Sequence, residues 1–200
     1  TGIGLPEAVN LIRGPKGTKI SLTIFREGES DTRSFTLGRD TIIVKSVVLS
    51  FKETKLGKKV AIIKLSRFGE KTDDEWNSAV SEILAAKPQA MILDVRNNPG
   101  GFLDGAVFIA SEFLEGGSVV LQEDSDGVKT PFRVSRVGKL TKLPLLVLMN
   151  KGSASASEIV AGALRDHNRA QLAGENSFGK GTVQQAMDVG DKGGSVHLSI

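Results

Sequence analysis

The spacing of hydrophobic and polar residues at the start of the chain is typical of a helix followed by two strands. Pro6 stands where a first helical turn favours proline, and the apolar residues after it end at the stop signal Arg13-Gly14-Pro15. From Lys19 to Ile24 apolar and polar residues alternate, as in a half-buried strand, and residues 33–37 can return as its hairpin partner. One helix and two strands are too few to hold a core, so we expect this stretch to be the last part of a larger module.

The rest of the chain alternates between strand and helix patterns. Expected strands lie at residues 42–48, 60–65, 90–95, 118–122, 145–149, 170–173 and 182–187, and expected helices run from 72 or 73 to Pro88, from 103 to 114 and from 155 to 166. The first of these helices carries one apolar stripe, formed by Trp76, Val80, Ile83 and Leu84. Continuous apolar strands such as residues 145–148 favour a sheet that is covered on both faces. The predicted fold class is therefore α/β.

Composition supports a folded chain and removes several classes of function. The 200 residues are 40% hydrophobic and 24% charged, which suits one domain or one domain plus a fragment. The net charge is only +3 and the basic residues are scattered, so we expect no nucleic-acid partner. Zero cysteines exclude a disulfide framework, a thiolate zinc site and a cysteine nucleophile, and they suit an oxidising compartment. The longest apolar run, residues 143–149, is far shorter than the roughly 20 residues of a membrane helix, so no transmembrane segment is expected.

Two junctions between a strand and a helix carry residues that can do chemistry, because functional groups of open α/β sheets gather at such points. The first is residues 94–101, with the sequence DVRNNPGG. Its paired glycines permit positive φ and leave backbone N–H groups uncovered, as an oxyanion hole requires. Taken alone, this sequence favours a tight turn without chemistry.

The second junction, residues 150–158, places Ser153, Ser155 and Ser157 just before a helix. Unpaired N–H groups and the helix dipole favour developing negative charge there, which suits a nucleophile. Ser155 and Glu158 also fit a capping box, which the spacing alone favours. The spacing does not choose among the three serines.

A serine nucleophile needs a base. His167 lies about 18 Å beyond Ser155 along a helix that rises 1.5 Å per residue, so it cannot reach; His197 is expected to face outward from a strand, although distance does not exclude it. A lysine can act as base where burial lowers its pKa, and the candidate is Lys180, which glycines flank. If a strand continues from Lys180, Gln184 points to the same face and can orient the amine. A lone lysine in a glycine turn otherwise favours a solvated charge.

The same segment imitates a phosphate-binding loop, because Gly174 is followed after four residues by Gly179-Lys180. The next residue is Gly181, where that motif needs Ser or Thr, so no nucleotide is expected. With two histidines and no cysteine, a catalytic zinc site is not expected either. Acidic pairs such as Asp73-Asp74 are better explained by a helix start than by glycosidase carboxylates. We therefore expect no metal and no cofactor.

Three blocks, in this order, resemble the carboxyl-terminal processing peptidases, also called tail-specific proteases. They are residues 97–101 (NNPGG), 152–159 (GSASASEI) and 174–184 (GENSFGKGTVQ), and the separation of 25 positions from Ser155 to Lys180 is also that of the family. Upstream, residues 5–18 resemble the last helix and the following strand of the family's PDZ domain. The resemblance thus covers nearly the whole chain.

The resemblance implies an α/β core of the ClpP/crotonase kind, built from strand-strand-helix units. Residues 40–200 would form this peptidase core, truncated at its C-terminal end, and residues 1–39 the C-terminal part of a PDZ domain whose N-terminal part is absent. Such a piece is expected to recognise free C-termini incompletely and to be inactive or in a resting form. The family also implies an extracytoplasmic location, such as the periplasm, cell envelope or lumen, and leaves a homo-oligomer open.

The resemblance implies a role for each site residue. Ser155 would be the nucleophile of a serine endopeptidase, Lys180 its general base and Gln184 the residue that holds the lysine. The backbone N–H groups of Gly101 and Ala156 would form the oxyanion hole. The partners would be protein or peptide substrates with apolar C-terminal tails, cleaved near the C-terminus.

Two other hypotheses about the function stay open at this point, each from a different functional class. One is a non-catalytic, PDZ-containing peptide-binding scaffold on a crotonase-like body, in which the serine merely caps a helix. The other is a crotonase enzyme that handles acyl-CoA, which shares the fold and the oxyanion hole. Unlike the peptidase, neither requires a serine next to a lysine.

Asp166 matches an acidic position of the family for which we expect a structural role.

Overall fold

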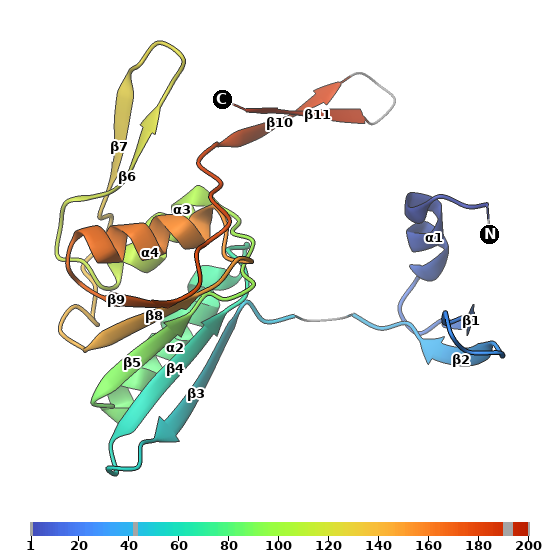
Figure 1. Cartoon of the computed structure of the whole chain (residues 1–200), viewed down its shortest axis with the longest axis horizontal. Helices are drawn as coiled ribbons and strands as arrows, with labels where there is room; N and C mark the ends of the chain where they lie inside the picture. Colours follow the sequence, from blue (N-terminus) through green and yellow to red (C-terminus); the bar gives the residue numbers. More distant parts are fainter. Residues whose placement is uncertain (1, 42–43, 190–193, 200) are drawn as a thin grey trace. The chain divides into compact units, whose positions relative to one another are not determined.

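The computed structural model of the chain describes residues 2–41, 44–189 and 194–199, and it divides into two units, residues 1–44 and 45–200 (Figure 1). The first unit holds α1 (Leu5–Ile12), β1 (Lys19–Ile24) and β2 (Arg33–Gly38), and the two strands form an antiparallel hairpin. The elements lie where the sequence predicts them. The assignment of this unit to a PDZ domain stays a prediction.

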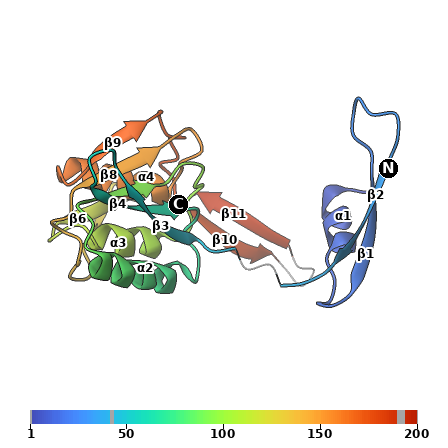
Figure 2. The ribbon, with the colours of Figure 1, turned by 90° about the horizontal axis from the view of Figure 1, so that it is seen from below.

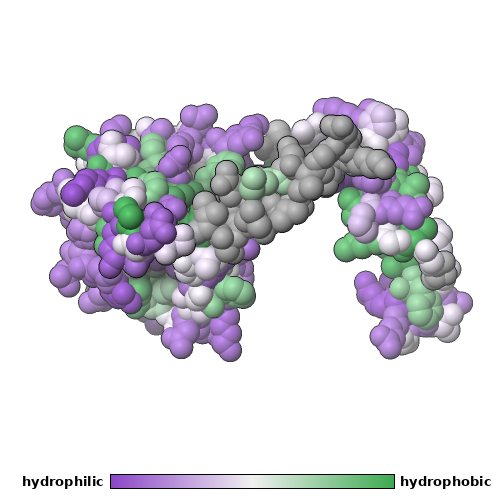
Figure 3. Space-filling model, turned by 90° about the horizontal axis from the view of Figure 1, so that it is seen from above, coloured by the Kyte–Doolittle hydropathy of each residue, from purple (hydrophilic) through white to green (hydrophobic). Residues whose placement is uncertain are grey.

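Arg39 ties the helix of the first unit to its hairpin. Its guanidinium donates hydrogen bonds to the carbonyls of Leu11 and Ile12 and to Thr18 Oγ1. No residue of α1 is buried, and hydrophobic side chains are exposed on this unit (Figure 3). As the small number of elements predicts, none of the core residues in the described part of the chain comes from this unit.

The second unit is built on a five-stranded sheet with the order β3-β4-β5-β8-β9. These strands are β3 (Val47–Glu53), β4 (Lys59–Leu65), β5 (Ala90–Asp94), β8 (Leu145–Met149) and β9 (Gln171–Gly174). The last four are mutually parallel, and β3 runs antiparallel to β4. The strand expected at residues 42–48 begins only at Val47, and residues 42–43 lie outside the described part.

Three helices form one layer over one face of this sheet (Figure 2). They are α2 (Thr72–Ala86), α3 (Leu103–Ser111) and α4 (Ala156–Asp166), and α3 packs beside both of the others. Burial alternates along β4, where Ala61 and Ile63 are fully buried while Val60 and Ile62 are partly exposed. The prediction of a sheet covered on both faces is therefore wrong for the described residues, because apolar side chains on the second face are only half covered.

The apolar stripe of α2 faces the core as its spacing predicts, with one exception. Trp76, Val80 and Ile83 are buried, whereas Leu84 is 42% exposed at the margin of the stripe. The Trp76 ring packs edge-to-face against Phe113, with 5.8 Å between the ring centroids. Such a pair adds about 1 kcal/mol to the free energy of burial.

Two hairpins complete the second unit. β6 (Ser118–Glu123) pairs with β7 (Lys129–Arg133), and β10 (Gln184–Val189) pairs with β11 (Gly194–Ser199), both antiparallel. β7 was not expected from the sequence, and the strand expected at residues 182–187 begins two residues later. In the described ranges no helix is both long and apolar enough to cross a membrane.

Candidate active site

Two of the three serines fasten the strand-to-helix junctions to each other. Ser153 Oγ donates to the carbonyl of Val95 at 2.8 Å, and Ser157 Oγ donates to the carbonyl of Asn98 at 2.9 Å. Both serines are completely buried. Ser155 lies between them in sequence, is partly exposed and lines a cavity. The structure therefore distinguishes the three serines, which the spacing did not.

The backbone of Ser155 is strained. Its φ of 55° and ψ of −117° lie in a region that non-glycine residues rarely adopt, at a cost on the order of 1–3 kcal/mol. The turn places Ser155 directly before the first residue of α4, where backbone N–H groups are unpaired. Its own N–H donates to Glu158 Oε2 at 2.7 Å, the interaction that a capping box predicts.

The glycine pair opposite this turn is required by space as well as by conformation. Gly100 and Gly101 have φ of 100° and 142°. A Cβ on Gly100 would lie 2.7 Å from the carbonyl oxygen of Ala154, and one on Gly101 would overlap the carbonyl oxygen of Phe68. Asn98 fixes the turn, because its Oδ1 accepts from the Gly100 N–H and its Nδ2 donates to a β4 carbonyl. The close approach of two chains explains the Gly-Gly sequence.

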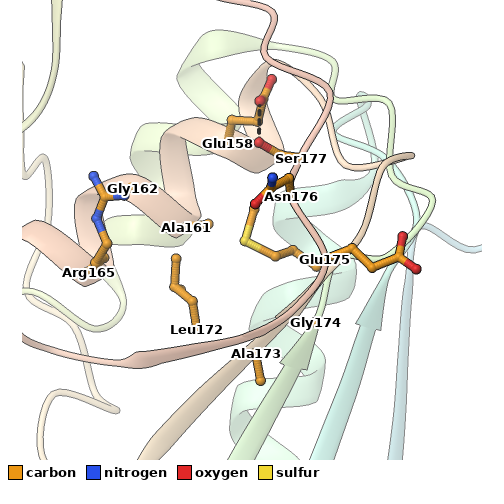
Figure 4. Close-up of a pocket in the computed structure, with 11 residues that line it drawn as sticks. Glu158, Ala161, Gly162, Arg165, Leu172, Ala173, Gly174, Glu175, Asn176 and Ser177 are labelled. Carbon is orange, nitrogen blue, oxygen red and sulfur yellow. Dashed lines mark hydrogen bonds between the residues drawn. The ribbon is translucent and has the colours of Figure 1, made fainter.

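Glu158 joins the serine turn to the segment that carries Lys180. Its Oε1 accepts from Ser177 Oγ at 2.7 Å (Figure 4) and from the Gly179 N–H at 2.6 Å. Its Oε2 accepts from the N–H groups of Ser155 and Lys180, the latter at 3.0 Å. Four donors from two segments therefore meet at one carboxylate.

These hydrogen bonds keep the carboxylate ionised. Burial raises the pKa of Glu158, but the hydrogen bonds from Ser177, Gly179, Ser155 and Lys180 outweigh this effect and hold the pKa below its usual value. From the sequence, Glu158 was only the second half of a capping box. Its contacts with Ser177, Gly179 and Lys180 depend on a loop some twenty positions away, which no local pattern indicates.

The side chain of Lys180 is directed to Gln184. Lys180 Nζ donates to Gln184 Oε1 at 3.2 Å, so the pairing expected from the sequence is present. The expected reason for it is wrong, because residues 181–183 are not a strand and β10 begins at Gln184 itself. Among the hydrogen bonds of the described residues, none joins this amine to the Ser155 hydroxyl.

One cavity of about 660 Å³ brings the predicted site residues together. Its lining includes Gly101, Ser155, Ala156, Lys180 and Gln184, all five of the residues that the resemblance implies. The rest of the lining is largely apolar and includes four consecutive residues of β6 that the sequence did not indicate. These β6 residues could have been found only from the way the hairpin packs.

His167 and Asp166 stand apart from this cavity. His167 Nε2 lies 2.9 Å from the carbonyl of Ser118, at the far end of α4. His197 is on β11, and its side chain lies outside the described residues. Asp166 pairs with the neighbouring Arg165 on the surface. No group of three or more potential metal ligands occurs within the part of the chain that was described.

A second hollow, of about 410 Å³, lies on another side of α4, between this helix and β9 (Figure 4). Glu158, Arg165 and Glu175 are among its lining residues. It shares Glu158 with the network described above but does not contain Ser155 or Lys180.

Residues 59–200 match the family described as Peptidase family S41. The chain is 38% identical to the carboxyl-terminal-processing protease of Synechocystis sp. over 96% of its length, and 38% identical to the carboxy-terminal processing protease CtpA of Bacillus subtilis over its whole length. It spans only 45% and 41% of these two relatives.

Solved structures of proteases also match this chain. A structure described as a photosystem II D1 C-terminal processing protease matches 99% of this chain with a TM-score of 0.72 and 29% identity, and 54% of that chain is covered. A putative S41 protease from Bacteroides fragilis, 17% identical, shares the fold over 92% of this chain and 55% of its own, with a TM-score of 0.65. The chain belongs to peptidase family S41.

Proposed function

We propose that this chain carries the catalytic core of a serine endopeptidase that cleaves protein substrates near their C-termini. The observation that carries the proposal is the single cavity lined by Gly101, Ser155, Ala156, Lys180 and Gln184, which come from three separate segments. The names of the S41 relatives, as carboxyl-terminal processing proteases, support the same activity. The apolar part of the lining suits substrates with apolar tails.

In the proposed mechanism, Ser155 Oγ attacks the carbonyl carbon of a peptide bond while the neutral amine of Lys180 takes its proton. The amine then protonates the leaving nitrogen, and water hydrolyses the acyl-enzyme through the same groups. The N–H groups of Gly101 and Ala156 hold the oxyanion in both steps, and each such donor contributes about 100- to 1000-fold in rate. Gln184 holds the lysine between the two steps.

The hydrogen bond from Lys180 to Gln184 is, in this proposal, the resting arrangement of the site. For the first step the amine must turn from Gln184 Oε1 towards the Ser155 hydroxyl, which lines the same cavity. A substrate that fills the cavity excludes water from it, which leaves the Ser155 hydroxyl as a hydrogen-bond partner for the amine.

The finer architecture is part of the same proposal. Residues 1–39 would be the C-terminal part of a PDZ domain, supported by the order of α1 and the β1–β2 hairpin. Residues 40–200 would be a ClpP/crotonase-like core, supported by the strand-strand-helix unit of β3, β4 and α2. An extracytoplasmic location agrees with the lack of cysteine.

A fluorophosphonate probe, with mass spectrometry of the labelled peptide, tests the assignment. We expect labelling at Ser155, and we expect Ser155→Ala and Lys180→Ala each to abolish labelling and peptide cleavage. Two matched controls, the exposed Lys151→Ala and the distant His167→Ala, should keep both.

The results of these assays distinguish the serine–lysine peptidase from the peptide-binding scaffold. Turnover retained by Lys180→Ala at neutral pH would contradict the serine–lysine assignment. Tight peptide binding without labelling in any variant would instead favour the peptide-binding scaffold.

A further inference from the structure

Two turns leave the sheet side by side where β5 and β8 end. The first, residues 95–101, follows β5 and carries Gly101. The second, residues 150–156, follows β8 and carries Ala156 directly after Ser155. β5 and β8 are parallel neighbours in the sheet, so both turns lie at the same edge. The two proposed oxyanion donors therefore come from different turns, and the distance between them depends on how the turns are joined.

The N–H groups of Gly101 and Ala156 are both unpaired. Within the described ranges, neither of them donates to another group of the protein. The residues on either side of Gly101 are fixed by Phe68, whose N–H donates to the Gly100 carbonyl at 2.9 Å and whose carbonyl accepts from the Phe102 N–H at 3.0 Å. Both donors are thus available to a ligand, provided that the two turns keep them at the right distance.

A single oxygen atom joins the two turns. Asn150 Oδ1 accepts from the Asn97 N–H at 2.9 Å and from the Gly152 N–H at 3.1 Å, one donor from each turn. Asn150 Nδ2 donates to Asn97 Oδ1 at 3.0 Å, which fixes the orientation of the carboxamide. A Cβ on Gly152 would lie only 2.8 Å from Asn97 Oδ1, so the turns are in close contact at this point.

The backbone of Asn97 is held by the same pair of side chains. Its φ of 60° lies in the left-handed region, which asparagine adopts more readily than most other residues. In this conformation its N–H and its Oδ1 both reach the Asn150 carboxamide. The two hydrogen bonds therefore stabilise a backbone conformation that is otherwise unfavourable.

Further hydrogen bonds between the turns are buried. The hydroxyls of Ser153 and Ser157 donate to carbonyls of the first turn, as described above. The Ala154 N–H donates to the Asn98 carbonyl at 3.0 Å. These bonds do not involve the Asn150 side chain, so we expect them to keep the turns together when it is removed.

The bonds to Asn150 Oδ1 differ from these in their surroundings. Asn97 and Gly152 are both exposed, so water can replace the oxygen as the partner of their N–H groups at little cost in stability. A water molecule is not attached to the chain and does not keep the two N–H groups at one distance. Loss of the carboxamide should therefore change the geometry of the turns more than the stability of the fold.

We propose that Asn150 is a positioning residue, which sets the distance between the Gly101 and Ala156 N–H groups by joining the two turns. The inference rests on the proposed function and adds a residue to that site. Asn150 does not line the cavity that contains Ser155, so it acts through the turns and not on the substrate. Because the two N–H groups bind an oxyanion that develops in the transition state, a wrong distance lowers kcat and leaves KM nearly unchanged.

Kinetics of Asn150→Ala, compared with a distant asparagine variant, test the inference. We expect kcat on a peptide substrate to fall about ten- to hundred-fold, since a misplacement of 1 Å can cost about 100-fold, and KM to stay within about two-fold. The control is Asn168→Ala: Asn168 also has a left-handed φ, of 52°, but lies just beyond the far end of α4. It should keep kcat even if urea denaturation shows a loss of stability. An unchanged kcat in folded Asn150→Ala would overturn the inference.

A rescue experiment isolates the shared oxygen. Asn150→Asp keeps an oxygen for the Asn97 and Gly152 N–H groups but turns a second oxygen towards Asn97 Oδ1, so we expect kcat to fall about ten-fold. Asn97→Gly in the same chain removes the facing oxygen and permits positive φ without strain, so it should restore most of the loss. No restoration in a folded double variant would overturn the inference, also where Asn150→Ala does not fold.

Backbone NMR signals separate this inference from the proposed function. In Asn150→Ala the amide signals of Gly101 and Ala156 should shift, whereas Asn168→Ala should leave both in place. If the wild type neither cleaves a peptide nor reacts with fluorophosphonate, yet both signals shift, the proposed function fails and the positioning stands. If the wild type cleaves the peptide and Asn150→Ala leaves the two signals in place, the positioning fails alone, whatever the value of kcat.

Discussion

The turn at the proposed site requires glycine at positions 100 and 101, because a Cβ atom at either position would clash with neighbouring backbone atoms. The sequence predicted a tight turn whose glycines permit positive φ, and both residues do have positive φ. Glycines permit a close approach of another segment, but which segments approach was not predictable, because Phe68 and Ala154 come from other parts of the chain. Local sequence indicates that a close approach is possible, whereas the segments that make it are decided by the fold.

A matched pair of glycine substitutions tests this point. Gly101→Ala must displace the carbonyl of Phe68 and adopt an unfavourable φ, so we expect it to lower the free energy of unfolding by about 1–3 kcal/mol and to reduce peptide cleavage by about 100-fold or more. Gly162→Ala, on α4 with open space around it, should raise stability by about 0.5–1 kcal/mol. Urea denaturation measures both. Equal effects of the two substitutions would contradict the steric argument.

Glu158 gives a prediction of pH dependence. Its pKa is lowered in the folded chain, so its ionised form contributes stability above the unfolded pKa, and that contribution is lost as the pH falls through the folded pKa. Glu158→Gln removes this titration and leaves fewer acceptors for the four donors. We expect the stability gap between wild type and Glu158→Gln to narrow as the pH falls below the ordinary carboxyl value of 4.5. A gap that stays constant in acid, measured by urea denaturation, would exclude this role.

At the scale of elements, the long apolar strands and the amphipathic α2 were predictable because each is decided by its own residues. β8 has the predicted bounds, and β4 differs from its prediction by one residue. β7, with the sequence KTPFR, was missed because its pattern lacks alternation and contains Pro131. It is a strand because β6 offers it a partner, and Asp124 Oδ1 closes the turn by accepting from the N–H groups of Asp126 and Val128.

α3 ends three residues earlier than predicted, and Glu112 accounts for this. Its carboxylate is completely buried and accepts from Trp76 Nε1 at 3.2 Å, Arg136 Nη2 at 2.6 Å and the Lys139 N–H at 2.6 Å. The N–H groups of Glu112 and Phe113 turn to carbonyls three residues back, which ends the regular helix. A charged residue in an apolar run is easily assigned to a helix surface, so this inward position was not foreseen.

Removal of the buried Glu112 carboxylate should strongly lower the free energy of unfolding. Glu112→Ala leaves Arg136 and Trp76 Nε1 without their partner, so we expect a loss of about 3–5 kcal/mol in the free energy of unfolding. Arg136→Ala and the double variant complete a double-mutant cycle. The double variant should lose clearly less free energy of unfolding than the sum of the losses of Glu112→Ala and Arg136→Ala. Additive losses would mean that the two side chains act independently.

On the scale of the whole molecule, the hydrophobic core belongs to one unit. Its described buried members run from Val47 to Leu164, and none lies in residues 1–44. The proposed site also lies within the second unit, since all five predicted residues line one cavity there. The sequence located these residues through their motifs, but only the folded chain shows which of them share a cavity.

Separate production of the two units tests this division. We expect residues 45–200 to unfold in one cooperative transition close to that of the whole chain, because the apolar surface that stabilises folding is buried within this unit. A peptide of residues 1–44 should show little secondary structure by circular dichroism, since none of its α1 residues is buried. Loss of cooperative unfolding in residues 45–200 would show that the first unit supplies part of the core.

The position of Glu158 also bears on the order of events in biosynthesis. The carboxylate is present as soon as α4 forms, but three of its four donors, on Ser177, Gly179 and Lys180, emerge about twenty residues later. A nascent chain that has made only the helix therefore cannot yet assemble the proposed peptidase site. The proposed site would be completed only after the segment that carries Ser177, Gly179 and Lys180 has emerged.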